Sequence, residues 1–260
     1  MKKDLSIPTD VGLIHVEIYE SEEKRLPLLL LHGAYLNSSL WHPLLSSLEN
    51  RTLILPNLPH HGHSQKVKGD WTLHECSQML IEILNHLNIK RVLAVGHDLG
   101  AMILLRSAVS HPQRFGALGF ANMPWRPVHS SARIFDALNF PALHLSRFHA
   151  RQTAKQLFAP ESLSRDSRLS IRLAASLSQI SPQRIHYLNQ QVLLHSESGE
   201  PYLKRLQVPA FALRGEQDSV KDPPHLITTL VPGGHISVWE QESLFRSWME
   251  TTILAIPQSS

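Results

Sequence analysis

The sequence feature that most constrains this chain is a turn in which a glycine stands on either side of an acidic residue. Gly96 and Gly100 bracket Asp98, an apolar run over 92–95 precedes them, and an apolar helical pattern follows directly. This order predicts a buried strand, a sharp turn and a helix. Flanking glycines let the strand and the helix approach closely, while the central residue takes a strained backbone conformation. The turn therefore presents the Asp98 carboxylate at the end of a strand.

Short apolar runs alternate with amphipathic helical patterns along most of the chain. Thr72 and Glu75 form a capping box, which opens a helix with apolar residues at helical spacing. Predicted strands lie at two positions within 4–20 and at 27–31, 52–55, 92–95, 117–121 and 208–213. The alternation predicts the α/β fold class, with a mostly parallel twisted sheet and helices on both faces.

The alternation lapses between about 124 and 205. Helical patterns continue there, for example over 181–192, with no strand predicted between them. We therefore expect a core domain formed by residues 1–123 and 206–260, and a helical insertion over 124–205.

The composition is that of a globular enzyme and argues against several classes of function. Apolar residues make up 42% and charged residues 18% of the chain, and the net charge is +3. Because acidic residues are interspersed among the lysines and arginines, we expect no nucleic-acid partner. No apolar run is long enough to span a membrane, so we expect no membrane association and a cytoplasmic protein. The 17 histidines lack metal-ligand spacing, and we expect no metal and no cofactor.

Five short motifs stand at predicted strand ends along the chain. They are His32-Gly33, Leu58-Pro-x-x-Gly62-x-Ser64, Gly96-x-Asp98-x-Gly100, Arg214-Gly-Glu-Gln-Asp218 and Gly233-Gly-His235. Together they resemble the motifs of the α/β-hydrolase superfamily, and the resemblance covers nearly the whole chain. The superfamily uses the order nucleophile, acid, histidine, which this chain repeats. The resemblance implies the α/β-hydrolase fold, with the helical insertion as a cap over the site.

The resemblance also implies a role for each motif. Asp98 corresponds to the nucleophile, His235 to the general base and Asp218 to the acid that orients the histidine. The backbone N–H groups of Ala34 and Leu99 correspond to the oxyanion hole. The dipole of the following helix favours an ionised aspartate, which attacks an sp3 carbon without help from a base. His235 is then left to activate the water that hydrolyses the ester formed on Asp98.

Within the superfamily, an aspartate at the nucleophile position resembles the epoxide hydrolases, and less closely the haloalkane and fluoroacetate dehalogenases. Fluoroacetate dehalogenases place arginines just after the nucleophile, where this chain has Leu99 and Met102. Haloalkane dehalogenases hold the halide with tryptophan or asparagine side chains at positions that are Leu99 and Ala34 here. The resemblance therefore favours an epoxide hydrolase that acts on a small apolar organic substrate, as a monomer or homodimer.

Epoxide hydrolases protonate the opening ring from the cap, usually with two tyrosines or with a histidine and a tyrosine. Tyr187 falls near the position of the second acid, and His144 and His149 fall near the first. Tyr35, next to the predicted oxyanion hole, and Trp125, at the start of the cap, are further predicted substrate contacts. Packing of the cap on the core is an equal interpretation for Tyr187 and Trp125.

Two features depart from the epoxide hydrolase pattern. Tyr35 replaces the proline of the usual His-Gly-x-Pro motif. The stretch between Asp218 and His235 is short and contains three prolines, so its helix must be reduced to a turn or the last strand shortened. Asp222 is a rival for the acid role, whereas Asn122, after an earlier predicted strand, leaves no carboxylate at the other usual site.

The same motifs also resemble those of serine carboxylesterases and lactonases, with the serine replaced by Asp98. Two alternatives therefore stay open besides a dehalogenase. In the first, Asp98 and His235 work by acid–base chemistry without a covalent step. In the second, the chain only binds a small ligand, as receptor-like members of the fold do.

Overall fold

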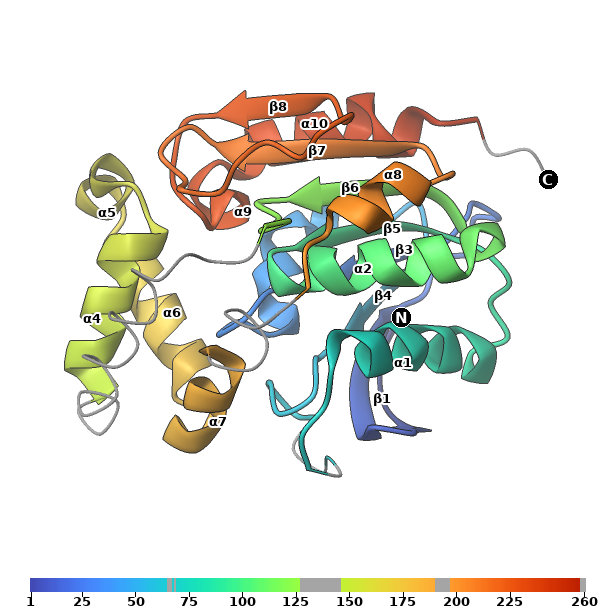
Figure 1. Ribbon diagram of the computed structural model, residues 1–260, viewed down its shortest axis with the longest axis horizontal. Coiled ribbons are helices and arrows are strands. Elements are labelled where there is room, and N and C mark those ends of the chain that lie inside the picture. The colour runs from blue at the N-terminus through green and yellow to red at the C-terminus, as the bar shows by residue number, and fades with distance from the viewer. Residues whose placement is uncertain (65–66, 68, 127–145, 190–196, 258–260) are drawn as a thin grey trace.

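The computed structural model describes residues 1–64, 67, 69–126, 146–189 and 197–257, and its described strands form one eight-stranded sheet (Figure 1). The strands are β1 (Lys2–Thr9), β2 (Gly12–Tyr19), β3 (Leu28–Leu31), β4 (Leu53–Pro56), β5 (Val92–His97), β6 (Phe115–Ala121), β7 (Ala210–Gly215) and β8 (Thr228–Val231). They are arranged in the order β1-β2-β4-β3-β5-β6-β7-β8. The pairs β1–β2 and β2–β4 are antiparallel, and all other neighbours are parallel. This is the mostly parallel sheet that the sequence predicts.

Helices cover both faces of this sheet (Figure 1). Those of the core are η1 (Ser38–Ser47), α1 (Leu73–His86), α2 (Leu99–Ser110), η2 (Pro112–Arg114), α8 (Glu200–Arg205), α9 (Ser237–Glu240), α10 (Glu242–Thr251) and η5 (Ile253–Ala255). Alternate residues of β3 enter the two layers, because successive side chains of a strand point to opposite faces. Leu29 and Leu31 join the hydrophobic cluster that includes α1 and α2, whereas Leu28 and Leu30 join the cluster that includes η1 and α10. Burial on both faces explains why the run over 27–31 is apolar throughout.

The start of α1 confirms the capping box. The Thr72 hydroxyl accepts the Glu75 backbone N–H, and the Glu75 carboxylate accepts the Thr72 backbone N–H. These bonds satisfy two backbone groups that a helix end leaves unpaired. Among the residues described, no helix is long and apolar enough to cross a membrane.

The remaining helices lie together beyond one end of the sheet (Figure 1). They are α4 (Ser146–Leu157), α5 (Pro160–Arg165), α6 (Arg168–Leu177) and α7 (Pro182–Tyr187). Ala150 and Ala154 of α4 and Leu173 of α6 share one buried cluster. No strand interrupts 146–189, as the sequence predicts for the cap.

The end of the predicted cap at 205 stays a prediction, and the contacts of α8 favour an earlier end. This helix lies beside α2 (Figure 1), and the Arg106 guanidinium of α2 stands 4.6 Å from the Tyr202 ring centroid. Leu203 is buried in the same cluster as α2. By its packing, α8 therefore belongs to the core layer.

The crossover between β7 and β8 explains the short spacing between Asp218 and His235. All residues of 216–227 are described, and they form turns without a helix. β8 has only four residues, and it pairs in parallel with β7. The short spacing requires a helix reduced to a turn or a shortened last strand, and the structure has both. His235 therefore reaches the carboxyl edge of the sheet directly after β8.

Candidate active site

Asp98 stands on a strained turn between β5 and α2. Its backbone has φ 49° and ψ −118°, a conformation that costs an L-residue about 1–3 kcal/mol. A Cβ at Gly100 would lie 2.4 Å from the Leu31 carbonyl oxygen, and one at Gly96 would lie 2.6 Å from the Ala101 nitrogen. Both positions therefore require glycine because rigid backbone approaches them. The turn predicted from the sequence is present.

The Asp98 carboxylate is buried, and its two oxygens have different partners. Oδ2 accepts the Ala34 backbone N–H at 2.9 Å, whereas Oδ1 lies 3.4 Å from Nε2 of His235. Burial by itself disfavours the charged form. The hydrogen bond and charge of His235, with a contribution from the Leu99 backbone N–H, outweigh burial and hold the pKa of Asp98 below its ordinary value. Asp98 is therefore ionised, with one oxygen held by an N–H group and the other facing the histidine.

His235 lies between two carboxylates. Its Nδ1 is 3.0 Å from Oδ2 of Asp218, on the side opposite Asp98. Burial alone would lower the pKa of the imidazole, but the charge of Asp218 and the hydrogen bonds to Asp218 and Asp98 raise it well above its ordinary value. The two carboxylates therefore favour the protonated imidazole.

Asp218, and not Asp222, is the carboxylate that contacts the histidine. Its Oδ2 also accepts the Asn122 side-chain amide at 2.6 Å, and its Oδ1 accepts the Val220 backbone N–H at 3.1 Å. Burial opposes ionisation, but the His235 charge and these hydrogen bonds lower the pKa of Asp218 to about 2. Asp222 is exposed and instead pairs with Arg214 at 2.6 Å.

Two buried polar residues that the sequence did not assign hold this array in place. The Asn122 side-chain amide donates to Asp218, and its side-chain oxygen Oδ1 accepts the Ser237 hydroxyl at 2.5 Å. Glu240 accepts the backbone N–H groups of Gly234 at 2.8 Å and of Ala159 at 2.9 Å. The position of Asn122 directly after β6 is a sequence signal for its role. Glu240 has no such signal, because its partner Ala159 lies 81 residues away in sequence.

Three further buried histidines surround Asp98. Nε2 of His97 lies 2.8 Å from the His235 carbonyl oxygen, which requires a proton on that nitrogen. The ring of His61 lies 5.2 Å from that of His32. Burial lowers the pKa of His61 and of His97 to about 4, and it lowers that of His32 well below its ordinary value. These rings are neutral, and among the residues described no cluster of three ligating side chains could hold a metal ion.

The structure does not place Tyr187 as a ring-opening acid. Its hydroxyl donates to the Trp71 carbonyl at 2.5 Å and accepts the Trp71 backbone N–H at 2.9 Å. A hydroxyl has one proton, and here that proton is used by the backbone of the core. Tyr187 therefore anchors the end of α7 to the core, which is the packing interpretation of this residue.

The other predicted substrate contacts have different outcomes. Trp125 is buried in the core, and its Nε1 donates to the Lys221 carbonyl at 2.9 Å, so packing is the interpretation that its contacts support. The Tyr35 hydroxyl donates to the side-chain oxygen of Asn189. His144 lies outside the described residues. The backbone of His149 belongs to α4, but its side chain is outside the part of the chain that the structure describes.

A buried nucleophile-position aspartate, a histidine and a second aspartate at the carboxyl edge of this sheet define a hydrolase-type site. The sequence profile described as the alpha/beta hydrolase fold matches residues 27–240. The chain therefore belongs to the α/β-hydrolase fold family, as its motifs predict.

Individual relatives are distant or match in part. An uncharacterized protein of Mycobacterium tuberculosis is 36% identical over 87 residues, which cover 33% of this chain and only 26% of that protein. The first curated relatives are thus matched over about a quarter of their own length. The 3-oxoadipate enol-lactonase 2 of Acinetobacter baylyi is 22% identical over 268 residues and 96% of both chains.

Solved structures share the fold at low identity. The crystal structure of the enol-lactonase from Burkholderia xenovorans LB400 superposes with a TM-score of 0.83. It is 16% identical and covers 95% of this chain and 98% of its own. At this identity the likeness concerns the fold alone, and the chemistry must be argued from the site.

Proposed function

We propose that this chain hydrolyses small organic substrates in two steps at an sp3 carbon, with epoxides as the substrate class. The observation that carries the proposal is the position of Asp98, with Oδ2 on the Ala34 N–H and Oδ1 facing His235. Oδ1 attacks a ring carbon, the carbon–oxygen bond breaks, and an ester forms on Asp98. The backbone N–H groups of Ala34 and Leu99 are the proposed oxyanion hole for Oδ2.

The charge of the site supplies the proton that ring opening needs. His235 is protonated while Asp98 and Asp218 are both ionised. Ester formation removes the charge of Asp98, which weakens the hold of His235 on its proton. Backside attack places the leaving oxygen on the far side of the carbon, so this proton reaches it through water. The opened ring oxygen becomes a hydroxyl, and His235 becomes neutral.

A neutral His235 then acts as the base of the second step. It takes a proton from water, and the hydroxide attacks the ester carbon of Asp98. Collapse of the tetrahedral intermediate releases the diol and restores the ionised Asp98 beside a protonated His235. The sum is one epoxide plus one water giving one diol, and the starting charges are regenerated.

Alkyl halides are a less suitable substrate for this arrangement. A departing halide needs no proton, so His235 would have to lose its own to solvent before the second step. The side chains of Leu99 and Ala34 also provide no hydrogen-bond donor for a halide.

Ester or lactone hydrolysis is the second candidate, because relatives and structural neighbours include enol-lactonases. Attack of Asp98 on an acyl carbon would give a mixed anhydride. Direct activation of water would instead need a neutral His235, which two carboxylates disfavour at neutral pH. This candidate therefore predicts activity that rises towards alkaline pH.

Intact-protein mass spectrometry of His235→Gln distinguishes these reactions, because loss of the base should trap the ester. We expect a mass increase equal to the whole epoxide, located in the peptide that contains Asp98, and none in His235→Gln/Asp98→Asn. An increase equal to an alkyl group alone, after incubation with alkyl halides, would identify a dehalogenase. Ester cleavage by the wild-type protein without any adduct would exclude Asp98 as the nucleophile.

A further inference from the structure

We propose that Tyr35 is a positioning residue through which the cap sets the oxyanion-hole N–H of Ala34, with Asn37 as a second connection. The inference rests on the proposed function, because it gives the hole a task in hydrolysing the ester on Asp98. It concerns the loop from His32 to Asn37, between β3 and η1, which we call the oxyanion loop. This loop contacts the nucleophile at one residue and the cap at two others.

Besides the His32 ring, whose Nδ1 lies 2.8 Å from the Gly33 carbonyl oxygen, side-chain contacts of Tyr35 and Asn37 hold the loop beside the oxyanion hole. Ala34 donates to Asp98 at 2.9 Å, and the next residue, Tyr35, has φ 64°. An L-residue rarely adopts this left-handed conformation, so surrounding contacts must hold it. The backbone bond across the turn, from the Leu36 N–H to the Gly33 carbonyl, is long at 3.4 Å. The orientation of the Ala34 N–H therefore depends on what the side chains of the loop contact.

The first of these contacts joins Tyr35 to the cap. Its hydroxyl donates to the side-chain oxygen of Asn189, which lies two residues beyond the end of α7. The Tyr35 ring is half-buried and packs against the hydrophobic clusters on both faces of the sheet. A shift of Asn189 is thus transmitted through a rigid ring to the residue that follows Ala34.

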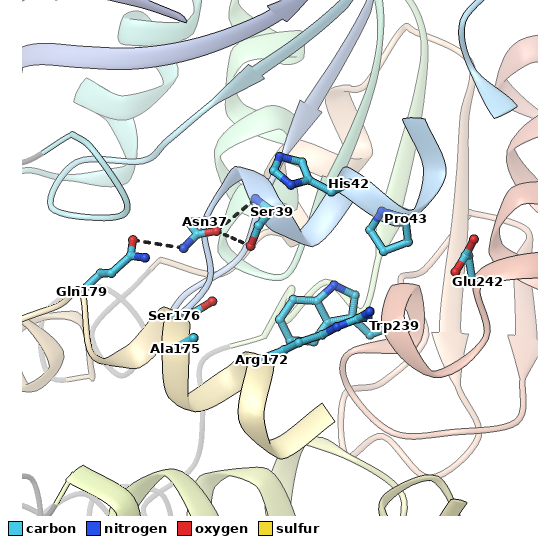
Figure 2. A pocket seen from close by; sticks show the side chains of 10 residues that line it. All are labelled: Asn37, Ser39, His42, Pro43, Arg172, Ala175, Ser176, Gln179, Trp239 and Glu242. Atoms are coloured by element: carbon cyan, nitrogen blue, oxygen red, sulfur yellow. Dashed lines mark hydrogen bonds between the residues drawn. The ribbon is translucent and has the colours of Figure 1, made fainter. Parts of the chain in front are cut away.

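The second contact joins Asn37 to Gln179, just beyond α6 (Figure 2). The Asn37 amide donates to the Gln179 side-chain oxygen at 3.3 Å, while its own oxygen accepts the Ser39 backbone N–H and caps η1. Beside this bond, a cleft of about 500 Å³ separates η1 from α6, with Trp239 and Arg172 in its wall (Figure 2). Because the cleft replaces close packing there, the bond from Asn37 is a localised link between the cap and the loop.

The two chemical steps depend differently on the Ala34 N–H. During alkylation, Oδ2 of Asp98 loses charge as the carboxylate becomes an ester. During hydrolysis, the same oxygen gains a full negative charge in the tetrahedral intermediate, so the N–H group matters more. Loosening of the loop should therefore slow hydrolysis more than alkylation. The covalent ester should then accumulate during turnover.

Tyr187 provides a matched control. Its hydroxyl also links the cap to the core, but through the Trp71 backbone and not through the oxyanion loop. Tyr35→Phe and Tyr187→Phe each remove one hydroxyl that links the cap to the core. Only the first change removes a link to Ala34. Asn189→Ala removes the same link from the cap side.

The test measures the fraction of protein that carries the ester during turnover of a saturating small epoxide, by rapid quench and intact mass. We expect this fraction to rise about tenfold in Tyr35→Phe and Asn189→Ala, and to stay at the wild-type level in Tyr187→Phe. Amide hydrogen exchange over residues 33–37 should accelerate in the first two variants only. Equal adduct fractions in Tyr35→Phe and Tyr187→Phe, or unchanged exchange at Ala34 in Tyr35→Phe, would overturn the coupling.

Failure of the proposed function has a separate signature. If His235→Gln forms no adduct with any epoxide, covalent catalysis by Asp98 is excluded. The hydrogen-exchange comparison of Tyr35→Phe, Asn189→Ala and Tyr187→Phe still decides whether the cap sets the oxyanion loop, since it needs no turnover.

Discussion

Nε2 of His235 lies 3.4 Å from Oδ1 of Asp98, close enough for each residue to control the charge of the other. Asp218 holds the opposite nitrogen at 3.0 Å, so the imidazole bridges two buried acids. Serine at position 98 would leave one carboxylate and a histidine that is readily neutral. With aspartate at position 98, two carboxylates favour the protonated histidine, and under the proposed mechanism its proton would be released when Asp98 is esterified.

This relationship predicts that Asp98→Asn lowers the pKa of His235. Burial opposes the protonated imidazole, and the variant loses one of the two carboxylates that outweigh it. NMR titration of the His235 ring in the two proteins measures the change. An unchanged pKa would mean that Asp218 alone sets the protonation of the histidine.

The same raised pKa determines how stability depends on pH. Because folding raises the pKa of His235 above its ordinary value of 6.5, its contribution is fully present below about pH 6.5 and is lost as pH rises through the folded-state pKa. The difference in unfolding free energy between wild type and His235→Gln should therefore shrink towards alkaline pH. Urea unfolding of both proteins at several pH values measures this difference. A difference that grows towards alkaline pH would contradict the expected pH dependence.

Asn122 should be a positioning residue for the acid. Asn122→Ala removes a charge-assisted hydrogen bond of 2.6 Å to Asp218, and we expect kcat to fall about 10- to 100-fold. The pKa of Asp218 should rise, which would move the acidic limb of the rate profile to higher pH. Ser237→Ala is the control, because its hydroxyl contacts Asn122 and not Asp218. Equal losses in the two variants would indicate a general packing effect.

The elbow was predictable because its physical requirements are local in sequence. Two glycines, one central residue and flanking apolar patterns lie within a few positions, and each has a steric reason. The sequence assigned the acid role to Asp218 but left Asp222 as a rival, because both carboxylates share one loop. In the structure Asp222 pairs with Arg214, whereas Asp218 contacts His235.

The cap was predictable in type but not in its contacts. Helical periodicity identified its secondary structure, whereas the partner of Tyr187 is a backbone group 116 residues away in sequence. The sequence does not distinguish a tyrosine whose hydroxyl anchors a cap helix to the core from one whose hydroxyl protonates the substrate. The sequence allowed for a shortened last strand before His235 but did not give its bounds, because the four residues of β8 follow a turn-rich stretch and only Val231 is buried.

Glu17 should be the main acid-sensitive group on the opposite side of the oxyanion loop. It is buried and accepts hydrogen bonds from Ser38 at 2.5 Å and from Tyr19 at 2.8 Å, with His42 at 3.0 Å. Burial raises the pKa of Glu17, but the hydrogen bonds of His42, Ser38 and Tyr19 outweigh it and lower the pKa. Its contribution is therefore present above the ordinary pKa of 4.5 and lost as pH falls.

We expect Glu17→Ala to lower the unfolding free energy at pH 7 by about 3 kcal/mol, because it leaves the buried Ser38 hydroxyl and the partly buried Tyr19 hydroxyl without their acceptor. Glu20→Ala is the control, since Glu20 is exposed and pairs with Lys3 at the surface, where such a pair contributes about 0.5 kcal/mol. Chemical unfolding at pH 7 and pH 4 measures both. A loss in Glu17→Ala no larger than that in Glu20→Ala would show that the network contributes little.

Gly100→Ala tests the elbow itself. The added Cβ would meet the Leu31 carbonyl oxygen at 2.4 Å and the His32 carbonyl oxygen at 2.5 Å, and backbone at the start of the oxyanion loop cannot move without disturbing Asp98. We expect about 3 kcal/mol of destabilisation together with loss of turnover. Gly116→Ala in β6 is the matched control, because the atoms nearest its Cβ would belong to side chains and not to backbone, with methyl groups of Leu26 and Leu93 nearest at 3.1 Å. Those methyl groups can shift, so we expect the control to lose about 1 kcal/mol and to keep its activity. Thermal unfolding and epoxide turnover measure the two effects, and equal losses would mean that burial of the glycine, and not its approach to the loop, sets the requirement.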